Sequence, residues 1–248
     1  MEYLFFILMI LLLIYVLYRN ISIFSRYRHN KSYIDCYKKM LQNDVNSYDE
    51  LCSYIEKEKS PEYISRANIL KLHEELQRGF DCTKTIEGID LKEIFYSNGK
   101  FTPSKLTMNS DVFIWLYMDM AKARQLSRFD VMNSLMKKLD EVPELQNRVE
   151  YLLAKAIYNA LNENEDGGVE FLNGLLQGNY TELGYDKGLI GLYKRFASST
   201  LAYINEPIDD YYKEDLHAFA NTLIGSNYMR DLEIYDKFPP VVLDNKEA

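Results

Sequence analysis

Residues 109–143 read NSDVFIWLYMDMAKARQLSRFDVMNSLMKKLDEVP, and this stretch decides the fold class. In its two halves, residues 109–126 and 129–141, apolar side chains recur every three or four positions, which is the period of an amphipathic helix. A two-residue turn that starts at Ser127 separates the halves, and Pro143 cannot continue the second helix. The stretch therefore predicts two antiparallel helices joined by a tight turn.

The same period runs through the rest of the chain from about residue 30 onward. Ser60 and Pro61 supply an N-cap and a first-turn proline, and Gly79 supplies the left-handed residue that often ends a helix. The clearest non-helical connection is residues 96–103, where Asn, Gly and Pro occur together. We expect an all-α fold, with helices over residues 31–42, 47–58, 61–78, 88–96, 109–126, 129–141, 144–161, 168–177, 185–204, 208–224 and 227–237.

The composition excludes several classes of protein. The 248 residues are 47% hydrophobic and 27% charged, which is ordinary for a folded globular chain. A net charge of −8 argues against nucleic-acid binding, because that requires basic residues at the phosphates. Cys36, Cys52 and Cys82 form no CxxC pair, so neither a disulfide framework nor a cysteine zinc site is expected.

The second helix of the 109–143 stretch resembles the second half of a tetratricopeptide repeat (TPR). Phe129 follows the turn, an apolar residue comes three positions later, and Pro143 ends the helix. The pattern departs from the family at Met132, where alanine is usual, at Asp119, where an apolar residue is usual, and by one residue missing before the proline. The resemblance implies a TPR-like array of helical hairpins. An irregular helical bundle is the alternative.

In a TPR-like array the first helix of each pair lines a groove that binds a peptide or a partner helix, as the resemblance implies. Tyr117, Arg124 and Gln125 would then face the groove, because positions 117 and 124 lie two turns apart on one helical stripe. The competing interpretation places Tyr117 and Trp115 in the core, since residues 112–118 are apolar on all sides.

Residues 3–18, YLFFILMILLLIYVLY, contain no charge and no helix breaker. Sixteen residues rise about 24 Å, so a membrane span would continue to residue 24 to cross a hydrocarbon core of about 30 Å. A buried core helix and a signal peptide are the alternatives, and the flanks fit both poorly. Residues 1–40 hold six basic and two acidic residues, with the basic ones after the apolar run. The pattern predicts a cell-membrane protein with its N-terminus outside and its C-terminal domain in the cytoplasm.

These features predict five segments along the chain. They are a transmembrane anchor (1–24), a basic juxtamembrane segment (25–45), a helical stalk or N-terminal helical subdomain (46–100), a TPR-like helical domain (101–238) and a disordered tail (239–248).

Residues 162–173, NENEDGGVEFLN, resemble an EF-hand loop. Asn162, Asn164 and Asp166 take ligand positions 1, 3 and 5, and Glu170 takes position 9. Position 12, which should be a bidentate glutamate, is Asn173. The alternative is a turn between helices in which Asn, Asp and Gly serve as caps and turn formers.

No P-loop, GxGxxG, GxSxG or HExxH motif occurs in the sequence. We therefore expect no catalysis, no cofactor and no resident metal. The sequence predicts a membrane-anchored helical scaffold or adaptor that binds a protein or peptide and contacts the bilayer through residues 3–24. A calcium-responsive regulator that uses residues 162–173 is the alternative.

Overall fold

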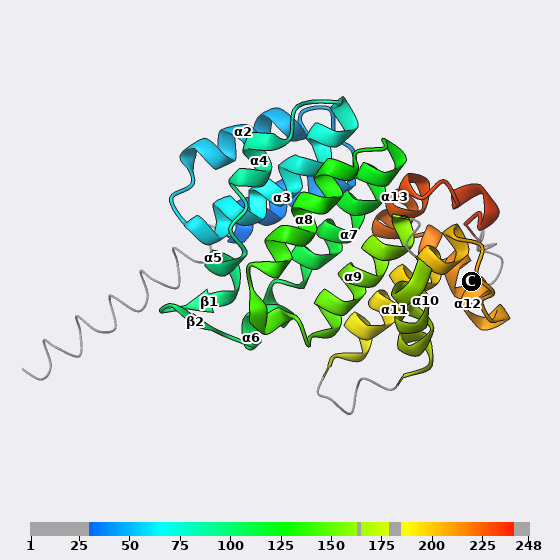
Figure 1. Cartoon of the computed structure of the whole chain (residues 1–248). Helices are drawn as coiled ribbons and strands as arrows, with labels where there is room; N and C mark the ends of the chain where they lie inside the picture. The colour runs from blue at the N-terminus through cyan, green and yellow to red at the C-terminus, as the bar shows by residue number, and fades with distance from the viewer. Residues whose placement is uncertain (1–29, 163–164, 179–184, 241–248) are drawn as a thin grey trace, which may run out of the picture.

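The computed structural model describes residues 30–162, 165–178 and 185–240 (Figure 1). Residues 30–41 form a helix that precedes the labelled elements. The elements that follow are α2 (Ser47–Lys57), α3 (Pro61–Arg78), α4 (Thr83–Glu87), α5 (Leu91–Phe95), β1 (Tyr96–Ser97), β2 (Lys100–Phe101), α6 (Ser104–Met108), α7 (Ser110–Gln125), α8 (Phe129–Asp140), η1 (Pro143–Leu145), α9 (Val149–Leu161), α10 (Glu165–Gln177), α11 (Lys187–Tyr203), α12 (Asp210–Ala220), α13 (Leu223–Asp231) and η3 (Tyr235–Lys237).

Four helices, α3, α7, α9 and α11, lie side by side in that order and form one row (Figure 1). Arg66 pairs with Asp111 and His73 with Asp119, so α3 and α7 run parallel. The hydroxyl of Tyr117 on α7 donates to the backbone oxygen of Glu150, at the start of α9, over 2.9 Å. This row is the centre of the molecule.

Helices α8, α10 and α12 form a second layer, because each packs against one or two helices of the central row. Helix α10 lies close to α9 at Gly168, because glycine has no side chain. An added Cβ on Gly168 would lie 2.6 Å from the backbone oxygen of Ala156 on α9. The tight turn at Ser127 places α8 antiparallel to α7 and outside the central row.

The helix α13 returns to the central row, where it packs on α7 and contacts α11 through Tyr228. Lys122 on α7 pairs with Asp231 over 3.0 Å, and the hydroxyls of Thr200 and Tyr228 lie 2.9 Å apart. Tyr228 and Met229 are fully buried, so α13 is part of the core.

The buried apolar residues form one cluster that extends from Tyr33 to Ile234. The cluster includes buried residues from both sides of residue 100, because α3, which precedes this residue, packs along α7, which follows it. Trp115 is 1% exposed, as expected for a helix that is apolar on all sides.

The only sheet among the described residues is a two-stranded hairpin, in which Tyr96 pairs with Phe101 and Ser97 with Lys100. Asn98 and Gly99 connect the strands with φ values of 52° and 71°. Two successive positive φ angles are those of a type I′ turn, and Asn-Gly is its favoured sequence.

The predicted all-helical fold is confirmed, but the prediction of an N-terminal membrane-spanning helix is not supported. In the part of the chain that the structure describes, no helix combines the length and the apolar character that a bilayer crossing needs. The 18 residues of α3 include charged side chains along the whole helix, and the 16 residues of α7 rise only about 24 Å. The single-pass architecture and the cell-membrane localisation that depended on this helix are therefore not supported. The predicted anchor, residues 1–24, with the bilayer contact assigned to residues 3–24, lies outside the described residues.

Candidate protein-binding surface at the ends of α3 and α7

The three residues predicted to face a groove do not lie together on an open surface. Tyr117 is fully buried and packs edge-on against Phe196 at 5.2 Å. Arg124 stacks over the ring of Phe129 at 5.2 Å. Gln125 is exposed and donates to the backbone oxygen of Arg230, so the C-terminal helix occupies its surroundings.

The EF-hand-like residues also lie in a different arrangement from the one that their spacing predicted. Asn162 follows the end of α9, and Asn164 lies outside the described residues. Asp166 and Glu170 belong to α10, whereas the ligand loop of an EF-hand curls around the ion. Across the described ranges, no group of three His, Cys, Asp or Glu residues could hold a metal ion.

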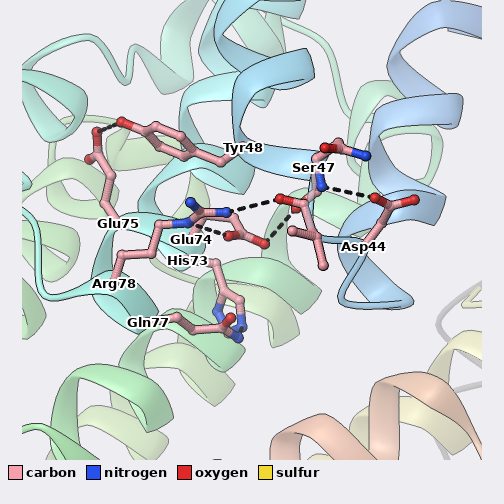
Figure 2. A network of polar contacts seen from close by, with 10 residues as sticks. Asp44, Ser47, Tyr48, His73, Glu74, Glu75, Gln77 and Arg78 are labelled. Atoms are coloured by element: carbon pink, nitrogen blue, oxygen red, sulfur yellow. Dashed lines mark hydrogen bonds and ion pairs between the residues drawn. The ribbon is translucent and has the colours of Figure 1, made fainter.

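A different site emerges where α3 ends, and it begins with a network of buried polar side chains (Figure 2). Glu74 and Glu75 are 5% and 4% exposed, which is unusual for carboxylates. Ser47, at the start of α2, donates to Glu74 over 2.8 Å, and the guanidinium of Arg78 lies 3.1 Å from the other oxygen of the same carboxylate. Both oxygens of Glu74 therefore have partners.

Glu75, the next residue of α3, also contacts α2 and a basic residue of its own helix. Lys71 lies 3.1 Å from its carboxylate, and the hydroxyl of Tyr48 donates to the same oxygen over 3.4 Å. Burial is the largest cause that raises the pKa of Tyr48 to about 12, so the phenol stays neutral and keeps its proton for this bond.

The network continues to the surface through Arg78 and Tyr48. Arg78 donates to the backbone oxygen of Val45 over 3.5 Å and stacks on the ring of Tyr48 at 4.9 Å. Tyr48 in turn packs edge-on against Phe80 at 5.6 Å. The buried charges of α3 thus fix two surface turns, one before α2 and one after α3.

A third turn, between α7 and α8, lies beside the turn that follows α3. Ser127 has a φ of 56°, and this left-handed residue lets the chain reverse between Leu126 and Phe129. Hydrogen bonds from Thr83 lower the pKa of Asp81, and the nearby charge of Arg128 adds to the effect. Arg128 reaches Asp81 electrostatically because α3 and α7 are parallel and end at the same side of the molecule.

These three turns present four large apolar side chains to solvent. Val45 is 85% exposed, Phe80 44%, Leu126 43% and Phe129 37%. We name this set the apolar rim. Arginines adjoin it at positions 78, 124 and 128.

A second polar cluster lies beneath the rim, where α3, α7 and α13 meet. His73 contacts Asp119 at 3.1 Å and accepts from Gln77 at 3.0 Å. Burial lowers the pKa of His73 to about 3 and raises that of Asp119 well above its usual range. Burial likewise raises the pKa of Asp231 to about 6, although Lys122 opposes the shift. These side chains are buried, so a substrate could reach them only if the helices separated.

No family model, curated protein or solved structure matches this chain. The candidate surface is therefore supported by its geometry alone. The sequence analysis did not identify the rim, because its members come from three turns that meet only in the folded structure. The available signal was an apolar residue directly after a helix end, as at Phe80 after Gly79 and at Leu126 before Ser127.

Proposed function

We propose that this protein is a non-catalytic helical interaction module that binds a partner protein through the apolar rim. The observation that carries the proposal is the exposure of four apolar side chains, Val45, Phe80, Leu126 and Phe129, on turns at the side where α3 and α7 end. Single exposed apolar residues are common on proteins, but a group of them often marks an interaction site.

The composition of the surface favours protein binding. Phenylalanine and arginine are enriched in the centres of protein interfaces, and here Arg124 already stacks on Phe129. Full burial of an apolar side chain of this size contributes about 1.5–3 kcal/mol relative to exposure. Because Phe80, Leu126 and Phe129 are already more than half buried, a partner that covered all four side chains would gain about twice that amount before the costs of association.

The network under the rim supports the same role. Arg78 holds the turn at Val45, and Tyr48 holds the ring of Phe80. A surface that is fixed before binding loses little conformational freedom when the partner arrives. The buried carboxylates Glu74 and Glu75 are therefore assigned a positioning role.

The test compares two rim variants with a control. Val45→Asp and Phe80→Asp place a charge on the rim, whereas Tyr211→Asp places one on α12 at a residue that is 71% exposed. Each purified variant is first checked for unchanged helical content and melting temperature. Quantitative cross-linking with a whole-cell extract of the source cells then identifies the proteins bound.

A protein that is bound in a constant ratio by the native chain and by Tyr211→Asp, and lost from both rim variants, would support the proposal. Equal recovery by all four proteins would show that the rim is not the binding surface. The absence of any partner bound in a constant ratio would argue against an interaction module.

A further inference from the structure

A second surface feature lies between α8 and α9, among residues that the apolar rim does not use. It is an open groove with a volume of about 370 Å³. A volume in this range is that of a ligand-sized site. Its polar lining consists mainly of Asn133, Lys137, Tyr151, Lys155, Tyr158 and Asn159.

Two hydrogen bonds cross between the helices and define this α8–α9 groove. Tyr158 donates to Oδ1 of Asn133 over 2.5 Å, and Tyr151 donates to Asp140 over 2.6 Å. Because the helices are antiparallel, Lys137 on α8 and Lys155 on α9 both lie in the segment between these two bonds. The two lysines therefore line the same part of the groove, one from each helix.

The lining offers donors more than acceptors. The oxygen of Asn133 already accepts from Tyr158, so its NH2 group is left to donate. Within residues 30–162, 165–178 and 185–240, neither Lys137 nor Lys155 has an ion-pair partner. Asp140 is the one carboxylate in the lining, and it accepts the hydrogen bond that the Tyr151 hydroxyl donates.

We infer that the α8–α9 groove binds an acidic peptide segment with closely spaced carboxylates. The chain as a whole carries −8, so a hollow with two lysines and one carboxylate differs in sign from the molecule around it. The lining covers two turns of each helix, about 10 Å, which is the length of about three residues of extended peptide. Two carboxylates on such a segment can each reach one ammonium group.

This inference is independent of the proposed function, because the groove shares no residue with the apolar rim. A partner bound at the rim and a peptide bound in the groove would be lost from different variants. The failure of one proposal therefore leaves the other in place.

The test uses the full chain and a defined probe. A fluorescein-labelled peptide, Gly-Asp-Glu-Asp-Glu-Gly, is titrated with the protein and followed by anisotropy, beside a matched Gly-Asn-Gln-Asn-Gln-Gly peptide. The double variant Lys137→Met and Lys155→Met removes both ammonium groups. The control, Lys57→Met with Lys213→Met, makes the same change of charge on exposed helical positions of α2 and α12.

We expect the acidic peptide to bind the native chain and the control variant alike. The groove variant should bind about tenfold more weakly or worse, and added salt should weaken the binding to the native chain. Equal binding of the amide peptide, equal loss in the control, or no binding of the acidic peptide would each overturn the inference. If citrate or inorganic phosphate bound as tightly as the peptide, the ligand of the groove would be a small anion and the inference of a peptide would be wrong.

Discussion

The Nδ1 atom of His73 lies 3.1 Å from Oδ1 of Asp119, and both side chains are buried between α3 and α7. Gln77 donates to the other ring nitrogen, so Nδ1 carries the proton that points to Asp119. Burial disfavours both charged forms, since it lowers the pKa of His73 and raises that of Asp119. Burial therefore favours the neutral form of both side chains, an imidazole next to a protonated carboxyl group.

This assignment predicts that Asp119→Asn is tolerated. The amide has the shape of a protonated carboxyl group, and its oxygen can still accept from His73. We expect a loss of less than about 1 kcal/mol in the free energy of unfolding at pH 7. Asp119→Ala leaves the ring nitrogen without a partner and should cost about 2–4 kcal/mol.

Urea unfolding of the two variants at pH 7 measures both values. If Asp119→Asn were as destabilising as Asp119→Ala, the pair would be an imidazolium and a carboxylate in the native protein. Gln77→Ala provides a further comparison, because it removes the partner of the opposite nitrogen only.

The raised pKa of Asp231 predicts that the stability of the protein depends on pH. Its pKa is raised from 3.8 to about 6, chiefly by burial, so the folded state binds more protons than the unfolded state between these values. The contribution of Asp231 to stability is therefore complete below pH 4 and is lost as pH rises through 6. A shift of about two pH units corresponds to about 3 kcal/mol.

The comparison of native chain and Asp231→Asn isolates this effect. The free energy of unfolding of each is measured from pH 4 to pH 7.5, and the difference between them is plotted against pH. The free energy of unfolding of Asp231→Asn should increase relative to that of the native chain as pH rises. A flat difference, or one of opposite sign, would show that Lys122 holds Asp231 ionised throughout.

The hydrogen bond from Ser47 on α2 to Glu74 on α3 should contribute to the stability of the protein. Ser47→Ala removes the 2.8 Å bond to Oε1 of buried Glu74 and should cost about 1–3 kcal/mol, because this oxygen has no other partner among the described residues. Ser53→Ala on the same helix removes an exposed bond from Lys57 and should change stability by less than about 0.5 kcal/mol. Thermal unfolding of both proteins measures the difference. Equal losses would mean that water replaces Ser47 at Glu74.

The local sequence predicted helix ends well where a capping residue marked them. The range 61–78 was predicted and observed, since Pro61 starts α3 and Gly79, with a φ of 69°, ends it. The helix predicted over 88–96 is observed only over Leu91–Phe95, and the short helix α4 was not predicted. Periodicity alone does not show that a new helix starts after Asp90, whose side chain accepts from the backbone of Lys92.

The candidate surface could not be predicted because its causes are non-local. Asp119 was noted as polar at a usually apolar position, but its partner His73 lies 46 residues earlier in the chain. Nothing near Glu74 in sequence indicates that Ser47 would satisfy it. The exposure of Val45 and Phe80 likewise depends on which turns meet when α3 and α7 pack in parallel.

Two glycines of α10 test the packing of the outer layer on the central row. An added Cβ on Gly168 would lie 2.6 Å from the backbone oxygen of Ala156, which cannot move without shifting α9, whereas Gly174 has open space around it. Gly168→Ala should therefore destabilise the protein by about 1–3 kcal/mol through overpacking. Gly174→Ala should stabilise it by about 0.5–1 kcal/mol, because alanine loses less backbone freedom in a helix. Both substitutions raise helix propensity equally, so urea unfolding would give equal stabilisation if α10 did not lie this close to α9.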